Sequence, residues 1–273
     1  MLHPKRMLAM LNYKLRRMKK YAEGETKLAG LEAWLEQEPV DWILYTGDSV
    51  NQGLEGEYLA AAPRMARTLG MARKGALAVP GNHDWYTEGS VRRYKRRMGA
   101  RLPKSDRPEW AGREGFPLVR FMGEEAVAIG LNTAVPHFNF WDSSGLVRAE
   151  EVERLAEILE KPEVRDRRWV FVMTHYPYLD TDWLHGLRGT DALWKVLAGR
   201  RNVVLLHGHN HYAYAKRSPE GQEVFCAGSL TKDGAEAFWL FEPYGDSLNA
   251  RLGRWEGGRW WTSGPTEGAA AEL

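Results

Sequence analysis

Two histidines that lie two positions apart, His209 and His211, follow a short apolar run at residues 203–206. The run predicts a buried strand, and Gly208 allows a sharp turn where that strand ends. In an extended segment this spacing sends both imidazoles to the same side. Neutral imidazoles are common metal ligands, so the pair indicates half of a metal site. An isolated pair of this kind is equally compatible with a surface histidine cluster.

Three earlier apolar runs end in side chains that could complete such a site. The runs cover residues 42–46, 76–79 and 169–173, and each predicts a strand. The polar side chains that follow them are Asp48, Asn82, His83, Asp84 and His175. Because sites in open α/β sheets form at the carboxyl ends of strands, these side chains are expected to converge.

One carboxylate, one amide oxygen and three imidazoles suit Mn, Fe, Zn or Co better than Ca or Mg. A carboxylate between two such ions would bridge them at roughly 3.5–4 Å, the separation that clamps an in-line phosphoryl displacement. The metals would activate a bound water and neutralise charge in the transition state. His83 could then face the substrate and protonate the leaving oxygen. Asp84 could orient His83 and raise its pKa.

Apolar runs and amphipathic segments alternate along the chain and predict an α/β fold. Helices are expected near residues 26–37, 55–70, 89–98, 148–160 and 190–199. Further strands are expected near 117–122 and 125–131, and antiparallel strands near 212–216, 222–227, 237–242 and 248–255. Residues 99–116 form an irregular insertion in this interpretation.

The composition is that of a globular protein. The 273 residues are 44% hydrophobic and 27% charged, and the alternation of elements favours one domain. A net charge of +2 indicates no specific nucleic-acid partner. The single cysteine, Cys226, excludes an internal disulfide and fits a reducing compartment. Neither a transmembrane segment nor a signal peptide is recognisable, so a cytoplasmic location is expected.

Residues 4–22 predict a helix with an apolar face and an otherwise basic surface. The helix either packs on the core with a solvated basic face or docks peripherally on an anionic membrane surface or an acidic substrate. The aromatic loop 137–141 either walls a substrate pocket or caps the core. The tail at 263–273 is small and polar and is expected to be disordered.

The motifs, taken in order, resemble the calcineurin-like metallophosphoesterase superfamily. They are Gly47-Asp48, Gly81-Asn82-His83-Asp84, His175 and Gly208-His209-Asn210-His211. The resemblance runs from about residue 42 to residue 212. It implies an α/β fold in which two mixed β-sheets pack as a central sandwich flanked by helices, in a four-layer architecture. It also implies a single metallophosphoesterase domain over residues 1–262.

The resemblance further implies a role for each motif residue. Asp48 would bridge two metals, and Asn82, His175 and His209 would complete one site. His211 would belong to the other site. His83 would be the catalytic histidine, with Asp84 beside it.

One motif of that superfamily is missing from this chain. An Asp-x-His motif after a first strand normally precedes Gly47-Asp48, and here the second metal site has only Asp48 and His211. Either an N-terminal segment with the first strand and two ligands is lacking, or this is a one-metal or metal-poor member. We prefer the first explanation because the chain begins abruptly at residues 3–6. Two divalent transition-metal ions (Mn, Fe or Zn) are then expected in the full-length protein, and one alone could bind to this chain.

The expected function is hydrolysis of a phosphodiester or pyrophosphate bond in a phosphorylated small molecule or lipid. The basic segment 5–12 resembles that of membrane-associated members that cleave a UDP-diacylglucosamine pyrophosphate bond. Members that act on cyclic nucleotides share the core motifs equally well. The alternative from another class is a scaffold or regulatory protein that keeps the fold without turnover. A serine hydrolase is disfavoured, because no Gly-x-Ser-x-Gly motif is present.

Overall fold

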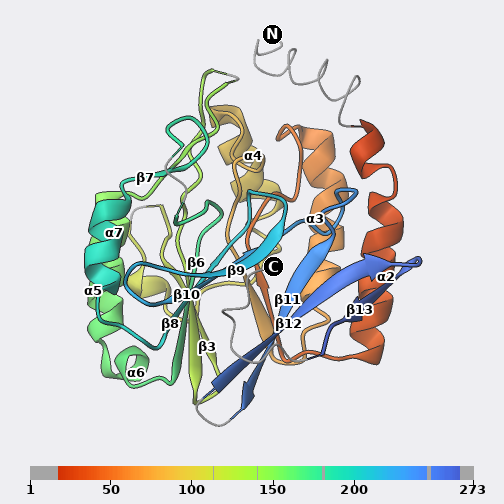
Figure 1. Ribbon diagram of the computed structural model, residues 1–273. Coiled ribbons are helices and arrows are strands. Elements are labelled where there is room, and N and C mark those ends of the chain that lie inside the picture. Colours follow the sequence, from red (N-terminus) through yellow and green to blue (C-terminus); the bar gives the residue numbers. More distant parts are fainter. Residues whose placement is uncertain (1–17, 113, 140, 180–181, 245–246, 265–273) are drawn as a thin grey trace.

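A computed structural model describes residues 18–112, 114–139, 141–179, 182–244 and 247–264. Its largest sheet has six strands in the order β3-β4-β6-β8-β10-β9 (Figure 1). Their bounds are Leu118–Met122, Ala126–Gly130, Trp169–Met173, Val203–His207, Glu223–Ala227 and Ala213–Arg217, respectively. The four inner strands are parallel, and the edge strands β3 and β9 run antiparallel to their neighbours. The carboxyl ends of β4, β6, β8 and β10 therefore share one edge.

Smaller sheets make up the rest of the β-structure. β1 (Trp42–Tyr45) pairs in parallel with β2 (Gly75–Ala78). β11 (Ala237–Tyr244), β12 (Ser247–Glu256) and β13 (Arg259–Thr262) form an antiparallel sheet. β5 (Gly145–Leu146) and β7 (Leu187–Arg188) pair in parallel and join two long loops.

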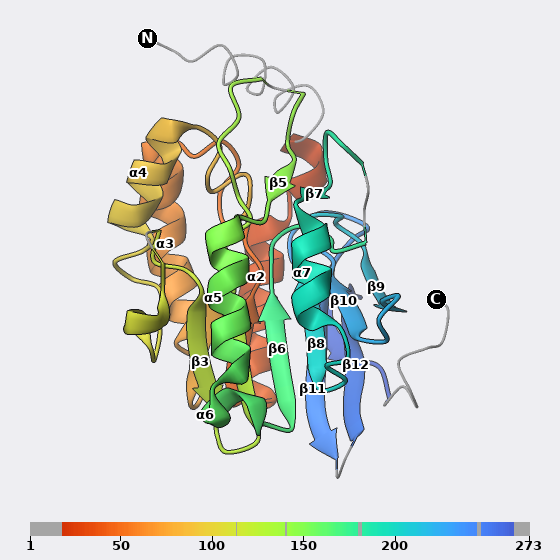
Figure 2. The same ribbon diagram turned by 90° about the vertical axis from the view of Figure 1, so that its left-hand side faces the viewer.

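Helices flank the sheets on two sides. They are α2 (Gly24–Gln37), α3 (Glu55–Leu69), α4 (Glu88–Arg97), α5 (Ala149–Glu160), α6 (Pro162–Arg165) and α7 (Thr190–Leu197), with 3₁₀ turns η2 (Met18–Tyr21) and η3 (Pro108–Trp110). α5 and α7 lie over the strands β6 and β8 (Figure 2). The structure confirms the predicted α/β class with a mixed central sheet and flanking helices.

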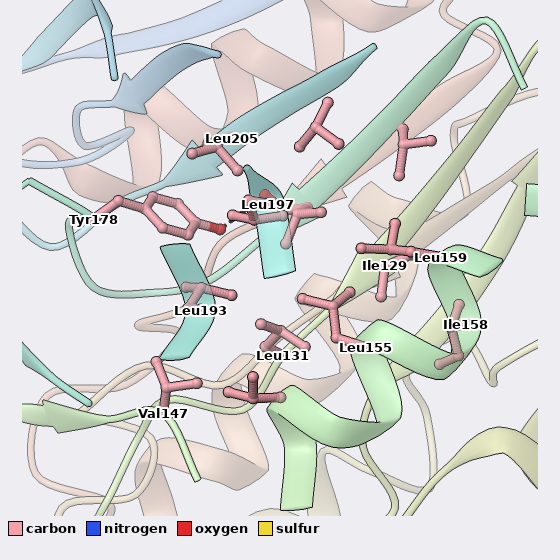
Figure 3. Close-up of a cluster of buried hydrophobic side chains, with 14 of the residues drawn as sticks. Ile129, Leu131, Val147, Leu155, Ile158, Leu159, Tyr178, Leu193, Leu197 and Leu205 are labelled. Carbon is pink, nitrogen blue, oxygen red and sulfur yellow. Dashed lines mark hydrogen bonds between the residues drawn. The ribbon is translucent and has the colours of Figure 1, made fainter. Parts of the chain in front are cut away.

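The apolar core follows from the side chains that these elements present. Leu155 of α5 and Leu193 of α7 are fully buried against Ile129 and Leu205 of the sheet (Figure 3). The opposite face of the same sheet packs against Leu77 of β2 and residues of β11 and β12. β-branched and aliphatic side chains occupy both faces of the inner strands, as expected for parallel strands buried on both sides.

Several predictions from the sequence need correction or extension. The strand predicted at 222–227 is antiparallel to β9 but parallel to β8, because it returns to the sheet after β9 forms the edge. The short strands β5 and β7, the helix α6 and the strand β13 were not predicted. Of the helix expected at 4–22, residues 1–17 lie outside the described residues, and Met18–Tyr21 form a 3₁₀ turn. The expected tail lies outside them from residue 265 onward.

None of the helices in the described ranges is both long enough and apolar enough to span a membrane.

One acidic side chain is buried beneath the carboxyl edge of the sheet. Glu151 of α5 is 4% exposed, and its Oε1 accepts a hydrogen bond of 3.2 Å from the backbone N–H of Asn132. Its Oε2 has no hydrogen-bond partner among the described residues. Burial raises the pKa of Glu151 to about 7, from an ordinary value of 4.5. Ionised Glu151 therefore destabilises the folded state.

We expect Glu151→Gln to stabilise the protein at high pH. The pKa of the acid is raised on folding, so the wild type loses stability as pH rises from about 4.5 to 7, and glutamine removes that loss. The free energy of unfolding should increase by about 1–3 kcal/mol at pH 8 and change little at pH 4.5. Urea unfolding at both pH values measures this, with exposed Glu153→Gln on the same helix as the control. Equal gains at both pH values would contradict the prediction.

Candidate metal centre

The loops after β1 and β2 approach each other so closely that two glycines are required. A Cβ atom at Gly81 would lie 2.1 Å from Oδ1 of Asp48. A Cβ atom at Gly47 would lie 2.5 Å from the backbone nitrogen of Gly81, and φ at Gly47 is +103°. Any larger residue at either position would push the loops apart. The glycines thus place Asp48 directly beside Asn82.

Three candidate ligands have a strained backbone. The non-glycine residues with positive φ in the described ranges are Asp48 (68°), His209 (68°) and His211 (58°). This left-handed conformation costs on the order of 1 kcal/mol or more for a residue with a side chain. Such strain concentrates where the surrounding structure fixes a functional side chain. All three residues were singled out from the sequence for their chemistry.

Four side chains from four strand ends meet at one point. Nε2 of His175 lies 2.9 Å from Oδ1 of Asn82 and 3.4 Å from Oδ2 of Asp48. Nδ1 of His209 lies 3.1 Å from the same Asn82 oxygen and 3.3 Å from Nε2 of His175. We call Asp48, Asn82, His175 and His209 the four-donor cluster.

These separations fit ligands of a single ion. Donors that bind a metal at roughly 2.0–2.2 Å lie about 2.8–3.6 Å from one another at octahedral or tetrahedral angles. In the described part of the chain, no group of three or more His, Cys, Asp and Glu side chains can by itself hold a metal ion. The amide oxygen of Asn82 contacts both imidazoles and supplies a further donor to the cluster.

The surrounding hydrogen bonds prepare His175 as a ligand. Its Nδ1 lies 2.7 Å from the carbonyl oxygen of Thr46. A carbonyl only accepts, so Nδ1 must donate its hydrogen, and Nε2 is the nitrogen that faces the cluster. Burial lowers the pKa of His175, but the neighbouring Asp48 outweighs burial and raises it, so a metal would displace a proton from Nε2 on binding. Burial, and then the charge of His175, lower the pKa of His209 to about 3. His209 is therefore neutral, the state in which an imidazole binds a metal.

Asp48 remains ionised although its side chain is only 17% exposed. Burial disfavours its charge, but the neighbouring His175 and His83 outweigh burial and hold the pKa of Asp48 well below its usual range. Its Oδ1 also accepts a hydrogen bond of 2.9 Å from the backbone N–H of His83. The carboxylate therefore links the cluster to His83.

Asp84 has a different role from the expected one. Its carboxylate accepts hydrogen bonds from the backbone N–H groups of Asp48 (2.8 Å), Ser49 (2.9 Å) and Gly81 (2.9 Å). Burial, and then the charge of Asp48, raise its pKa to about 7. Asp84 thus ties the two ligand loops together, rather than orienting the imidazole of His83.

His83 is held by groups that the sequence did not indicate. Its Nδ1 hydrogen-bonds to the carbonyl oxygen of Asn51, and its ring stacks on Tyr86 with centroids 5.8 Å apart. Because Nδ1 must donate to the carbonyl, Nε2 is the nitrogen that can exchange a proton with a substrate. The side chain is partly exposed, whereas Asp84 is fully buried.

His211 lies apart from the four-donor cluster. Its Nδ1 lies 3.3 Å from Nζ of Lys232, a residue that the sequence analysis did not identify. Burial and Lys232 lower the pKa of His211 to about 4. The structure therefore brings together one set of four donors, with His83 bonded to Asp48 through its backbone N–H and His211 in contact with Lys232.

Comparison with known proteins identifies the family. Residues 10–213 match the family described as calcineurin-like phosphoesterase. The match covers well over half of the 273 residues, so the chain belongs to the calcineurin-like phosphoesterase family. The resemblance recognised from the motifs is confirmed, and it implies a divalent metal cofactor. No curated protein matches the chain.

Solved structures of distant relatives share the fold. A dimetal phosphatase from Danio rerio has a TM-score of 0.65 and 14% identity, and the similarity covers 86% of this chain and 88% of that chain. GAP50 of Plasmodium, described as the anchor in the inner membrane complex, has a TM-score of 0.54 and 11% identity over 89% of this chain and 84% of that chain. At such identities the likeness concerns the fold alone.

We expect the four-donor cluster to bind a divalent ion such as Zn²⁺ or Mn²⁺. Asn82→Ala and His175→Ala should each weaken metal binding at least 10–100-fold, because each removes a donor from a preformed site. Metal content after dialysis and calorimetric titration measure the change. His185→Ala, at an exposed histidine outside the cluster, is the control. Metal binding that survives both ligand substitutions would contradict the assignment.

Proposed function

We propose that this protein is a metal-dependent phosphoester hydrolase that acts on a phosphodiester or pyrophosphate bond. The observation that carries this proposal is the four-donor cluster with a partly exposed histidine, His83, held beside it. Membership of the calcineurin-like phosphoesterase family supports it. A bound divalent ion would supply an activated water and Lewis-acid stabilisation of the phosphoryl oxygens.

The residues of the chain divide the remaining work. Asp48, Asn82, His175 and His209 would hold the ion. His83, protonated at Nε2, gives that proton to the leaving oxygen, and its Nδ1 stays bonded to the carbonyl of Asn51. The stacked Tyr86 restricts rotation of the imidazole, so the proton is presented in one direction.

A dinuclear centre is our proposal for the fully assembled site. The described fold resembles that of a dimetal phosphatase, and the family resemblance assigns Asp48 and His211 to a second ion. Two donors do not hold an ion by themselves. A second ion therefore requires ligands beyond those that the described residues provide, whereas the first ion does not.

The substrate class is suggested by two loops at the same edge of the sheet. They follow β4 and β6, pair through β5 and β7, and carry large exposed apolar side chains. The exposed fractions are 76% for Phe138, 53% for Trp141, 71% for Trp183 and 39% for Leu184. Exposed aromatic groups beside a phosphoesterase centre favour a substrate with an apolar portion. We therefore propose a UDP-diacylglucosamine-type lipid substrate, met at a membrane surface by a cytoplasmic protein, ahead of a cyclic nucleotide.

We expect His83→Gln to lower turnover of bis-p-nitrophenyl phosphate about 10²–10⁴-fold, because glutamine cannot donate the proton. Bound metal and thermal stability should stay at their wild-type values, since the side chain of His83 is outside the four-donor cluster. Steady-state kinetics with matched metal analysis measures this, with His185→Ala as the control. A fully metal-loaded wild type that cleaves no phosphoester would instead favour the scaffold alternative.

We also expect Trp183→Ala to raise KM for a diacyl substrate several-fold and to leave KM for bis-p-nitrophenyl phosphate unchanged. The indole is exposed, and its ring centroid lies 4.3 Å from Cζ of Arg188. The contact with Arg188 restricts the indole, so little side-chain entropy is lost when an acyl chain packs on it. Kinetics on both substrates measures the contrast. Equal effects on the two substrates, or efficient cleavage of cyclic nucleotides alone, would overturn the lipid proposal.

A further inference from the structure

The loop between β10 and β11 brings a lysine to the edge of the candidate metal centre. Because β10 is parallel to β8, the residues that follow β10 emerge at the same edge as His209 and His211. Lys232 lies in this loop, is partly buried, and places its Nζ 3.3 Å from Nδ1 of His211. The position of Lys232 results from strand pairing and is not visible in the local sequence.

Ion pairs to a buried lysine fix the loop that carries Lys232. Lys27 of α2 is 1% exposed and contacts the carboxylates of Asp233 and Glu236, on either side of the turn after Lys232. The backbone N–H of Asp233 also donates to the carbonyl of Lys20 at 2.8 Å. A lysine so fully buried is stabilised only when its charge is paired. The loop is therefore anchored on α2, and Lys232 is presented at a fixed place.

The contact between Lys232 and His211 determines what His211 can bind. An ammonium group has only donors, so Nδ1 of His211 must accept with its lone pair. A metal ion binds an imidazole at the nitrogen that carries no hydrogen, and while Lys232 donates to Nδ1 that nitrogen is Nδ1. In this arrangement Nδ1 is occupied by a positive N–H group, so the described residues do not fit a second metal at this atom. The positive charge next to His211 is instead the ammonium group of Lys232.

We propose that Lys232 is a substrate-binding residue that contacts a non-bridging oxygen of the phosphoryl group. Positive charge beside His211 would then come from the ammonium group of Lys232. An ammonium acts as a point charge that binds phosphate well. The inference rests on the proposed function for the identity of the ligand, but it concerns binding of the phosphoryl anion and not turnover.

The test uses inorganic phosphate as the probe and the dialysed, metal-loaded protein. We expect Lys232→Ala to raise the dissociation constant of phosphate at least about tenfold, the loss that corresponds to one charge-assisted hydrogen bond. Lys232→Arg should remain within about threefold of wild type, because it keeps the charge. Lys74→Ala is the matched control. It also removes one lysine charge, but Lys74 lies before the first residue of β2, at the end of that strand away from Asn82, where it pairs with Asp41. Calorimetry gives the binding constants, and metal analysis shows that the loading of all four proteins is equal.

Two results would overturn the inference: unchanged phosphate binding in Lys232→Ala, or no phosphate binding by the wild type. The proposed function fails separately. A wild type that binds phosphate through Lys232 but hydrolyses no phosphoester would refute hydrolysis and leave the role of Lys232 standing.

Discussion

The buried carboxylate of Asp84 is the interaction on which the centre depends. It accepts hydrogen bonds from the backbone N–H groups of residues 48, 49 and 81, and so fastens the loop after β1 to the loop after β2. Hydrogen bonds to a carboxylate in a dry interior are strong, and each broken one leaves a buried donor without a partner. The glycines at 47 and 81 remove the side chains that would prevent this approach.

The hydrogen bonds of Asp84 bring two carboxylates, Asp48 and Asp84, close together. The structure separates the roles of these carboxylates by their surroundings. Imidazoles hold the pKa of Asp48 far below its ordinary value, while burial raises that of Asp84 to about 7. The carboxylate of Asp48 is therefore ionised and able to bind a cation, whereas that of Asp84 accepts hydrogen bonds from backbone N–H groups. Asp48, His209 and His211 adopt a strained left-handed backbone conformation, and the surrounding packing stabilises that conformation.

The sequence predicted the parts of the site that local patterns encode. Apolar runs that end in a glycine located β1, β2 and β8, and the ligand types that follow them indicated a transition metal. Strand pairing is a long-range property, so the parallel docking of β10 on β8 was missed, and with it the position of Lys232. The role of Asp84 was also missed, because backbone N–H groups as partners leave no trace in residue types. The four-donor contacts show that Asn82 and His175, 93 positions apart, meet as the motifs implied.

The most direct test of the account is an anomalous diffraction map of the protein crystallised with Zn²⁺. We expect an anomalous peak within about 2.0–2.3 Å of Asp48 Oδ2, Asn82 Oδ1, His175 Nε2 and His209 Nδ1 at once. A map with no peak among these four atoms, or with the zinc bound by other side chains, would contradict the central claim.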